Sequence, residues 1–141
     1  MKRFPRGVIW FNRIVVGAAT FIMTAIAIRQ LRDPIGATAA MDIVLRSPTA
    51  VTIARVGFGG FPLGFAAALA GCLMSTRRLL TGVSLVAVVV GAATFARIQG
   101  LVLDGMTAYN VGLLRPEFAL LLLSSIGIAL ERRRIATTPG H

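Results

Sequence analysis

LLTGVSLVAVVVGAATFARI, residues 79–98, is the stretch of sequence that decides the fold. It is apolar almost throughout and contains no proline. Its length is that of a helix crossing a hydrocarbon core roughly 30 Å thick. Arg77 and Arg78 precede it, and Arg97 lies at its end. The stretch therefore predicts a membrane-spanning helix.

Three further apolar runs of spanning length lie on either side of it, at about residues 8–28, 49–74 and 116–131. The first begins like a signal peptide, but it is long and lacks a clear small-residue cleavage pattern, so we interpret it as a retained span. The last run is short, so we expect its span either to include residues before Glu117 or to lie in a thin part of the membrane. The sequence predicts an all-α fold, one integral membrane bundle of four transmembrane helices over residues 1–141.

Polar residues between the first two spans resemble helix starts. Ser47 before Pro48 predicts the cap and first position of the second span. Asp33 before Pro34 predicts a short helix lying on the membrane surface, and a plain loop is the alternative.

The composition excludes several classes of protein. Of 141 residues, 56% are hydrophobic and 14% are charged, and the mean hydropathy is +0.81, which excludes a disordered chain and an ordinary soluble domain. The net charge of +10 comes mainly from arginines at the ends of apolar runs, which predicts contact with membrane lipids and no nucleic acid. We expect a multi-pass protein of the bacterial inner, or cytoplasmic, membrane.

The distribution of basic residues predicts the orientation, because Lys and Arg in short loops favour the cytoplasmic side. The side with fewer of them holds Arg29, Arg32, Arg46 and Arg115, together with acidic residues. The richer side holds both ends of the chain, and its basic residues are Lys2, Arg3, Arg6, Arg77, Arg78, Arg132, Arg133 and Arg134. Both termini are therefore predicted to be cytoplasmic.

The second span contains glycines and a proline that suggest close packing. Gly57, Gly60 and Gly64 recur at helical spacing, and such positions let a neighbouring backbone approach. Pro62 removes a backbone donor, which predicts a kink in this helix. We interpret the glycine face as an intramolecular helix contact; a small cavity or a homodimer seam is the alternative.

Four charged residues in or beside the spans form the candidate site: Arg55, Arg97, Asp104 and Glu117. Under the predicted topology all four lie near the outer leaflet, and intramembrane charges usually turn inward and pair. We therefore expect an inward polar cluster; the alternative is that Arg55 and Arg97 reach the headgroups. Asn12 and Arg13, near the inner end of the first span, are interpreted as an anchor, with a polar site as the alternative.

Common catalytic sets are absent from the sequence. His141 is the only histidine and Cys72 the only cysteine. A Ser-His-Asp or Cys-His nucleophile, a His-ligated haem and a cysteine-based zinc site are therefore excluded within the spans. We expect no metal and no cofactor.

Several segments together resemble a bacterial membrane family, domain of unknown function 4345. They are SPTAVTIARVGFGGFPLG at residues 47–64, ARIQGLVLDG at 96–105, Asp33-Pro34 and Pro116-Glu117. The resemblance implies a four-span fold and groups Arg55, Arg97, Asp104 and Glu117 as a set. It implies no particular activity. Phe58 stands where the family commonly has tyrosine, which argues against a role that needs a phenol hydroxyl.

The sequence favours three functions, in this order. The first is a non-catalytic accessory or scaffold subunit of a membrane assembly, with other membrane subunits or a second copy as partners. The second is binding or transport of a lipid, quinone or other amphiphile, with Arg55 and Arg97 lining an outer-leaflet cavity. The third is an enzyme that depends on carboxylates or on a partner's cofactor.

Overall fold

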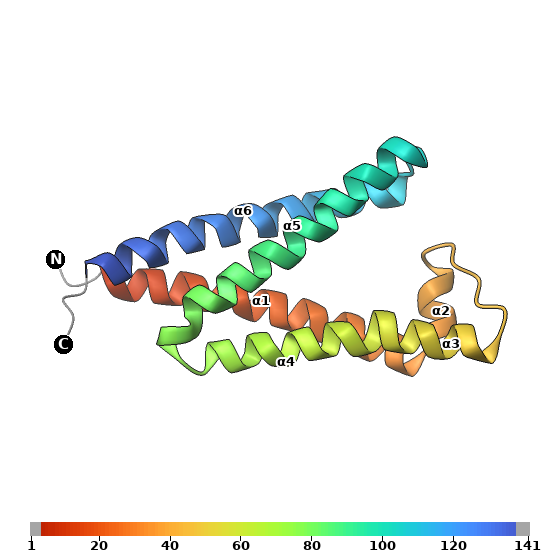
Figure 1. The fold of residues 1–141 in the computed structure, drawn as a ribbon, viewed down its shortest axis with the longest axis horizontal. Helices are drawn as coiled ribbons and strands as arrows, with labels where there is room; N and C mark the ends of the chain where they lie inside the picture. Colours follow the sequence, from red (N-terminus) through yellow and green to blue (C-terminus); the bar gives the residue numbers. More distant parts are fainter. Residues whose placement is uncertain (1–3, 138–141) are drawn as a thin grey trace. The chain divides into compact units, whose positions relative to one another are not determined.

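The chain is helical over most of residues 4–137, the part that the computed structural model describes. Figure 1 shows the order of the helices along the chain. Four of them, at Arg6–Arg32, Pro48–Leu73, Thr76–Leu103 and Ala108–Ala136, are long and apolar enough to cross a membrane. The elements are α1 (Phe4–Arg32), α2 (Pro34–Ala39), α3 (Pro48–Ala54), the π-helix η1 (Arg55–Gly60), α4 (Phe61–Leu73), the 3₁₀ turn η2 (Thr76–Arg78), α5 (Leu79–Leu103) and α6 (Ala108–Ala136).

The all-α class and the four apolar helices confirm the sequence prediction, because no strand occurs among the described residues. The main difference lies in the last helix, which begins at Ala108, eight residues before the predicted start at 116. Pro116 sits inside α6, which accommodates it. Arg115 and Glu117 interrupt the apolar run there but do not end the helix. The apolar run is therefore shorter than the helix.

Three α-helix starts are fixed by side-chain caps. The Asp33 carboxylate accepts a hydrogen bond from the Gly36 N–H at 2.9 Å, and the Ser47 hydroxyl accepts one from the Ala50 N–H at 3.1 Å. These contacts confirm the two predicted starts, each followed by proline at the first helical position. Thr107 caps α6 in the same way.

A π-helical turn separates α3 from α4 immediately before Pro62. The Phe61 N–H donates to the Val56 carbonyl five residues back, in place of the usual four. A proline in a helix has no N–H and crowds the carbonyl four residues before it. The wider π-helical turn therefore lies where Pro62 would disturb a regular α-helix. Such turns often occur at functional sites.

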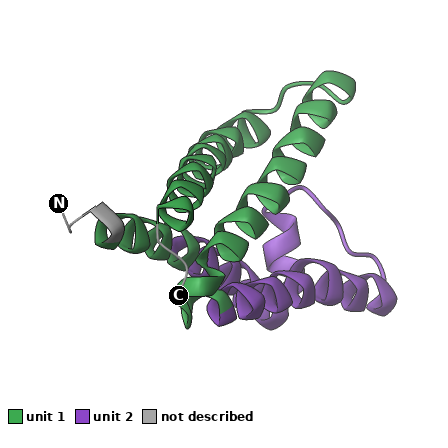
Figure 2. Ribbon diagram, turned by 60° about the vertical axis from the view of Figure 1, so that its left-hand side comes forward, with its two compact units in different colours: residues 1–17, 72–141 green, residues 18–71 purple. Residues whose placement is uncertain are grey.

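The described chain forms two compact units (Figure 2). Unit 1 comprises Met1–Gly17 and Cys72–His141, so it holds the first part of α1 together with α5 and α6. Its core is built from valines and a leucine, and Gly82 lets Val16 and Cys72 approach, since a Cβ there would lie 3.0 Å from the Cys72 Cβ. The buried core residues include Val8, Val15, Val16, Leu79, Val83, Val86 and Val90.

Unit 2 comprises Ala18–Gly71 and has a core of smaller side chains, among them Ala27, Ala54 and Ala66. Gly59 is buried against Leu31 of α1: a Cβ at this glycine would lie 2.8 Å from the Leu31 Cδ2. The close approach of η1 to α1 therefore depends on Gly59, a position that the sequence analysis did not single out.

Large apolar side chains are exposed along the spans of both units. Phe21 is 75% exposed, Phe61 74% and Phe95 70%. A soluble protein rarely presents such a surface, whereas hydrocarbon covers it without cost. Together with the four long apolar helices, this surface is that of a multi-pass membrane protein.

Candidate functional site

Arg97, near the end of α5, pairs with Glu117 of α6. The Arg97 Nε lies 3.0 Å from both carboxylate oxygens of Glu117, and its Nη2 lies 2.7 Å from Oε1. The third nitrogen, Nη1, donates to the Asn110 Oδ1 at 3.1 Å. The side chains of Arg97 and Glu117 are 22% and 18% exposed. All three nitrogens of this guanidinium are therefore engaged inside unit 1.

The first turns of α6 place both acceptors. Thr107 caps the helix through the Asn110 N–H, and Glu117 follows Asn110 by seven residues, which is two turns on nearly the same face. Arg97 lies across from this face on α5. The site therefore depends on Thr107 and Asn110, which precede the predicted span, as well as on Glu117 at its start.

Asp104 lies outside this contact. It caps the C-terminus of α5, is exposed, and its carboxylate forms no ion pair within unit 1. Arg97 and Asp104 do share one helix face, but two turns separate them by about 10.5 Å along the axis. The Arg97 nitrogens bond to Glu117 and Asn110 instead.

Arg55 belongs to unit 2 and begins the π-helix η1. Its side chain is exposed and makes no ion pair within that unit. Of the four predicted site residues, the structure brings together Arg97 and Glu117. The association of Arg55 with this pair stays a prediction.

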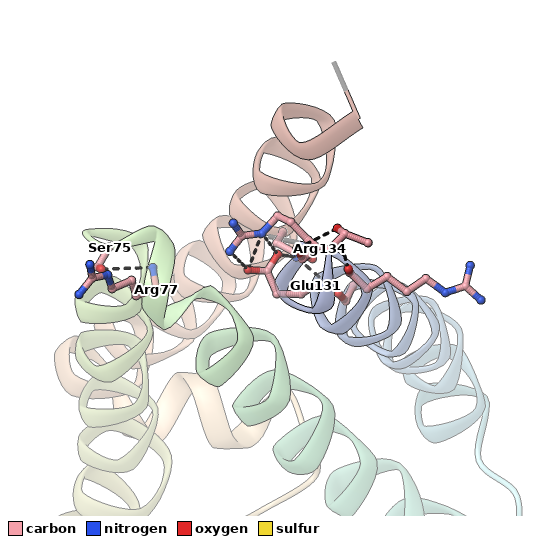
Figure 3. Close-up of polar contacts among 8 residues, drawn as sticks. Ser75, Arg77, Glu131 and Arg134 are labelled. Atoms are coloured by element: carbon pink, nitrogen blue, oxygen red, sulfur yellow. Dashed lines mark hydrogen bonds and ion pairs between the residues drawn. The ribbon is translucent and has the colours of Figure 1, made fainter. Parts of the chain in front are cut away.

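A second polar contact lies at the other end of unit 1, between α1 and α6. Asn12 and Glu131 are both fully buried, and the Asn12 Nδ2 donates to the Glu131 Oε2 at 3.1 Å. Arg134 turns back along α6 so that its Nε lies 3.0 Å from both Glu131 oxygens, and its Nη2 also contacts Oε1 (Figure 3). Asn12 is therefore an inward-facing polar residue, not part of an exposed anchor.

Gly127 makes room for this second contact. A Cβ at position 127 would lie 2.4 Å from the Asn12 Oδ1, so any side chain would displace the amide. The Gly127 carbonyl also accepts a hydrogen bond from the Asn12 Nδ2 at 3.4 Å. The glycine thus allows α1 and α6 to come close enough for Asn12 to reach Glu131.

The residues of α6 that the sequence analysis missed lie in one pattern with Glu117, which it predicted. Polar residues recur every seven positions along α6, at Asn110, Glu117, Ser124 and Glu131. Ser124 and Glu131 are fully buried, and the other two contact Arg97. A seven-residue repeat marks one face of a helix that packs along its neighbours. This repeat could have predicted the buried polar face from the sequence. It was overlooked because Glu131 is followed by three arginines, a pattern typical of an exposed helix end.

The predicted glycine face makes no close contact with other elements of unit 2. Apart from its chain neighbours and the backbone of its own helix, a Cβ at Gly57 or Gly64 would meet no atom of this unit within 4 Å, and one at Gly60 would meet only the Arg55 carbonyl, at 3.9 Å. Close packing in unit 2 falls instead on Gly59. The packing role of Gly57, Gly60 and Gly64 stays a prediction.

The polar residues of this α6 face (Asn110, Glu117, Ser124 and Glu131) include those that hold α6 against α1 and α5. Its polar positions are about 10.5 Å apart along the axis, too far for one hydrogen-bonded chain of side chains. Each carboxylate is neutralised by an arginine of the same unit. No group of three or more His, Cys, Asp or Glu able to hold a metal ion occurs among residues 4–137.

No family model, curated protein or solved structure matches the chain. The resemblance to domain of unknown function 4345 therefore stays a prediction.

Proposed function

We propose that the chain is a small non-catalytic protein of the bacterial inner membrane, an accessory or scaffold subunit of a larger assembly. The observation that carries the proposal is the engagement of Arg97. Each of its three nitrogens bonds to Glu117 or Asn110, so the guanidinium joins two helices and its charge is already neutralised by Glu117. Asn12 and Glu131 join α1 to α6 in the same way.

The surface that such a subunit would offer is apolar and includes the open glycines of α4 and η1. Gly57 and Gly64 leave space in which the backbone of another helix could lie, and small residues are common at contacts between membrane helices. A second copy or another membrane subunit fits this surface. A kink at Pro62, beside the π-helical turn, would present the same glycines to a partner.

Purification in mild detergent tests the scaffold proposal. We expect the native protein to carry a stoichiometric protein partner or a second copy, visible in the intact mass of the complex. Gly64→Leu should remove that mass, because the side chain would fill the space left for the partner. The thermal stability of the isolated chain should stay unchanged. A wild-type mass of one chain without a protein partner would contradict the proposal.

The second candidate function is binding or transport of a lipid, quinone or other amphiphile. Arg55 favours this function. It lies in a span, is exposed and has no ion pair within its unit, and it begins a π-helical turn, a feature common at functional sites. In the same purification, this function predicts a bound small molecule that is lost in Arg55→Gln. A bound protein that survives Arg55→Gln favours the scaffold.

We also propose that both termini face the cytoplasm. The arginines at residues 77–78 and 132–134 support this orientation, and four crossings return the chain to its starting side. Reporter fusions at Arg6 and after residue 141 should both report the cytoplasmic side. An external signal from either fusion would contradict the four-span arrangement.

A further inference from the structure

Arg13 of α1 is a cation without an anionic partner in its unit. It is half-buried, and its Nε is buried with no hydrogen-bond acceptor. The guanidinium carbon lies 5.9 Å from the centroid of the Trp10 ring, which holds the charge beside an exposed aromatic side chain. The group therefore lies near the ring and lacks a counter-charge within the described part of unit 1.

The acidic residue at this end of unit 1 is already neutralised. Glu131 accepts hydrogen bonds from Asn12 and Arg134 and is fully buried. The other acids of the described part of unit 1 lie away from this end: Asp104 follows the C-terminus of α5, and Glu117 lies in the N-terminal half of α6. The remaining charged side chains described at this end of the unit are exposed arginines: Arg6, Arg77, Arg78, Arg132 and Arg133. The described residues of unit 1 therefore supply no anion for Arg13.

We propose that Trp10 and Arg13 form a binding site for an anionic glycerophospholipid. The phosphate would accept hydrogen bonds from the Arg13 guanidinium, and the surrounding arginines would favour a headgroup with net negative charge. Trp10 is 63% exposed and Ile14, four residues on, is 66% exposed, so both offer apolar surface to an acyl chain. Indole rings are common at this depth of a membrane. The site is independent of the proposed scaffold function.

Trp10 provides the test, because it is the only tryptophan in the sequence and its fluorescence reports this site. The full chain is placed in vesicles that contain phosphatidylglycerol or phosphatidylcholine with bromine atoms on one acyl chain. Bromine quenches indole fluorescence on contact. We expect brominated phosphatidylglycerol to compete for the contact about five-fold better than brominated phosphatidylcholine, as one arginine near the membrane surface predicts.

Three variants separate a site from general electrostatic attraction. Arg13→Gln should abolish the preference for phosphatidylglycerol. Arg13→Lys keeps the charge but loses the planar pair of donors, so it should retain a reduced preference of about two-fold. Arg132→Gln, an exposed arginine at the same end, should keep the full preference. Equal quenching by both lipids in the wild type would overturn the proposal. An equal loss in Arg132→Gln and Arg13→Gln, or no change in Arg13→Lys, would also overturn it.

Discussion

Replacing Arg134 with glutamine is expected to lower the free energy of unfolding by about 3 to 5 kcal/mol, the range for removing one partner of a buried ion pair. Glu131 is fully buried and accepts hydrogen bonds from Arg134 and Asn12. Once the arginine is removed, the buried carboxylate keeps the Asn12 amide as a donor but loses its counter-charge. Unfolding in mixed detergent micelles, followed by the loss of helical circular dichroism, measures the change. Arg133→Gln is the matched control, because Arg133 is an exposed arginine of the same turn.

Two further variants check the cause of that loss. Adding Glu131→Gln to Arg134→Gln should recover part of the stability, because no charge is then left buried. Gly127→Ala should also destabilise the protein, since its Cβ would displace Asn12, whereas Gly112→Ala in the same helix has open space around it. If Arg134→Gln and Arg133→Gln behave alike, the buried contact between α1 and α6 does not stabilise the fold.

Replacing Arg97 with alanine is expected to lower the free energy of unfolding by about 2 to 3 kcal/mol, between the values for buried and exposed ion pairs. The loss is smaller than at Arg134 because both partners keep about a fifth of their side-chain surface exposed. Arg97→Lys should recover only part of it, since an ammonium group cannot match the side-on contact with Glu117 and the bond to Asn110 together.

Asp104→Asn is the matched control for this second prediction. The sequence placed Asp104 in the same cluster, but its carboxylate is exposed and unpaired within unit 1. We therefore expect its replacement to change stability by less than about 0.5 kcal/mol, as for most surface substitutions. A loss comparable to that of Arg97→Ala would return Asp104 to the cluster.

The sequence was sufficient to predict the helices and their caps. Apolar length alone marks a span, and Asp33-Pro34 and Ser47-Pro48 act through contacts with N–H groups three residues away. The apolar run alone placed the start of the last helix at 116, although its shortness already favoured a span that includes earlier residues, and the structure places the start at Ala108, capped by Thr107. Hydropathy measures where the chain is apolar, whereas the helix continues wherever the backbone can hydrogen-bond.

The partners within the site were harder to predict than the charges themselves. Arg97 and Glu117 stood out because charge in a span is rare, but helix periodicity applied equally to Asp104. Only the packing of α5 against α6 decides between the two acids. Glu131 was overlooked because three arginines follow it, a pattern typical of a solvated helix end, and its burial depends on Asn12 more than a hundred residues away.

The charged side chains within the spans of unit 1 join its helices to one another. A double-mutant cycle between Arg97 and Glu117, with leucine at each position and at both, measures that connection most directly. We predict a coupling energy of about 2 kcal/mol, with the double variant more stable than the sum of the two single losses implies. A coupling energy near zero would show that the two side chains act independently, and would contradict the claim.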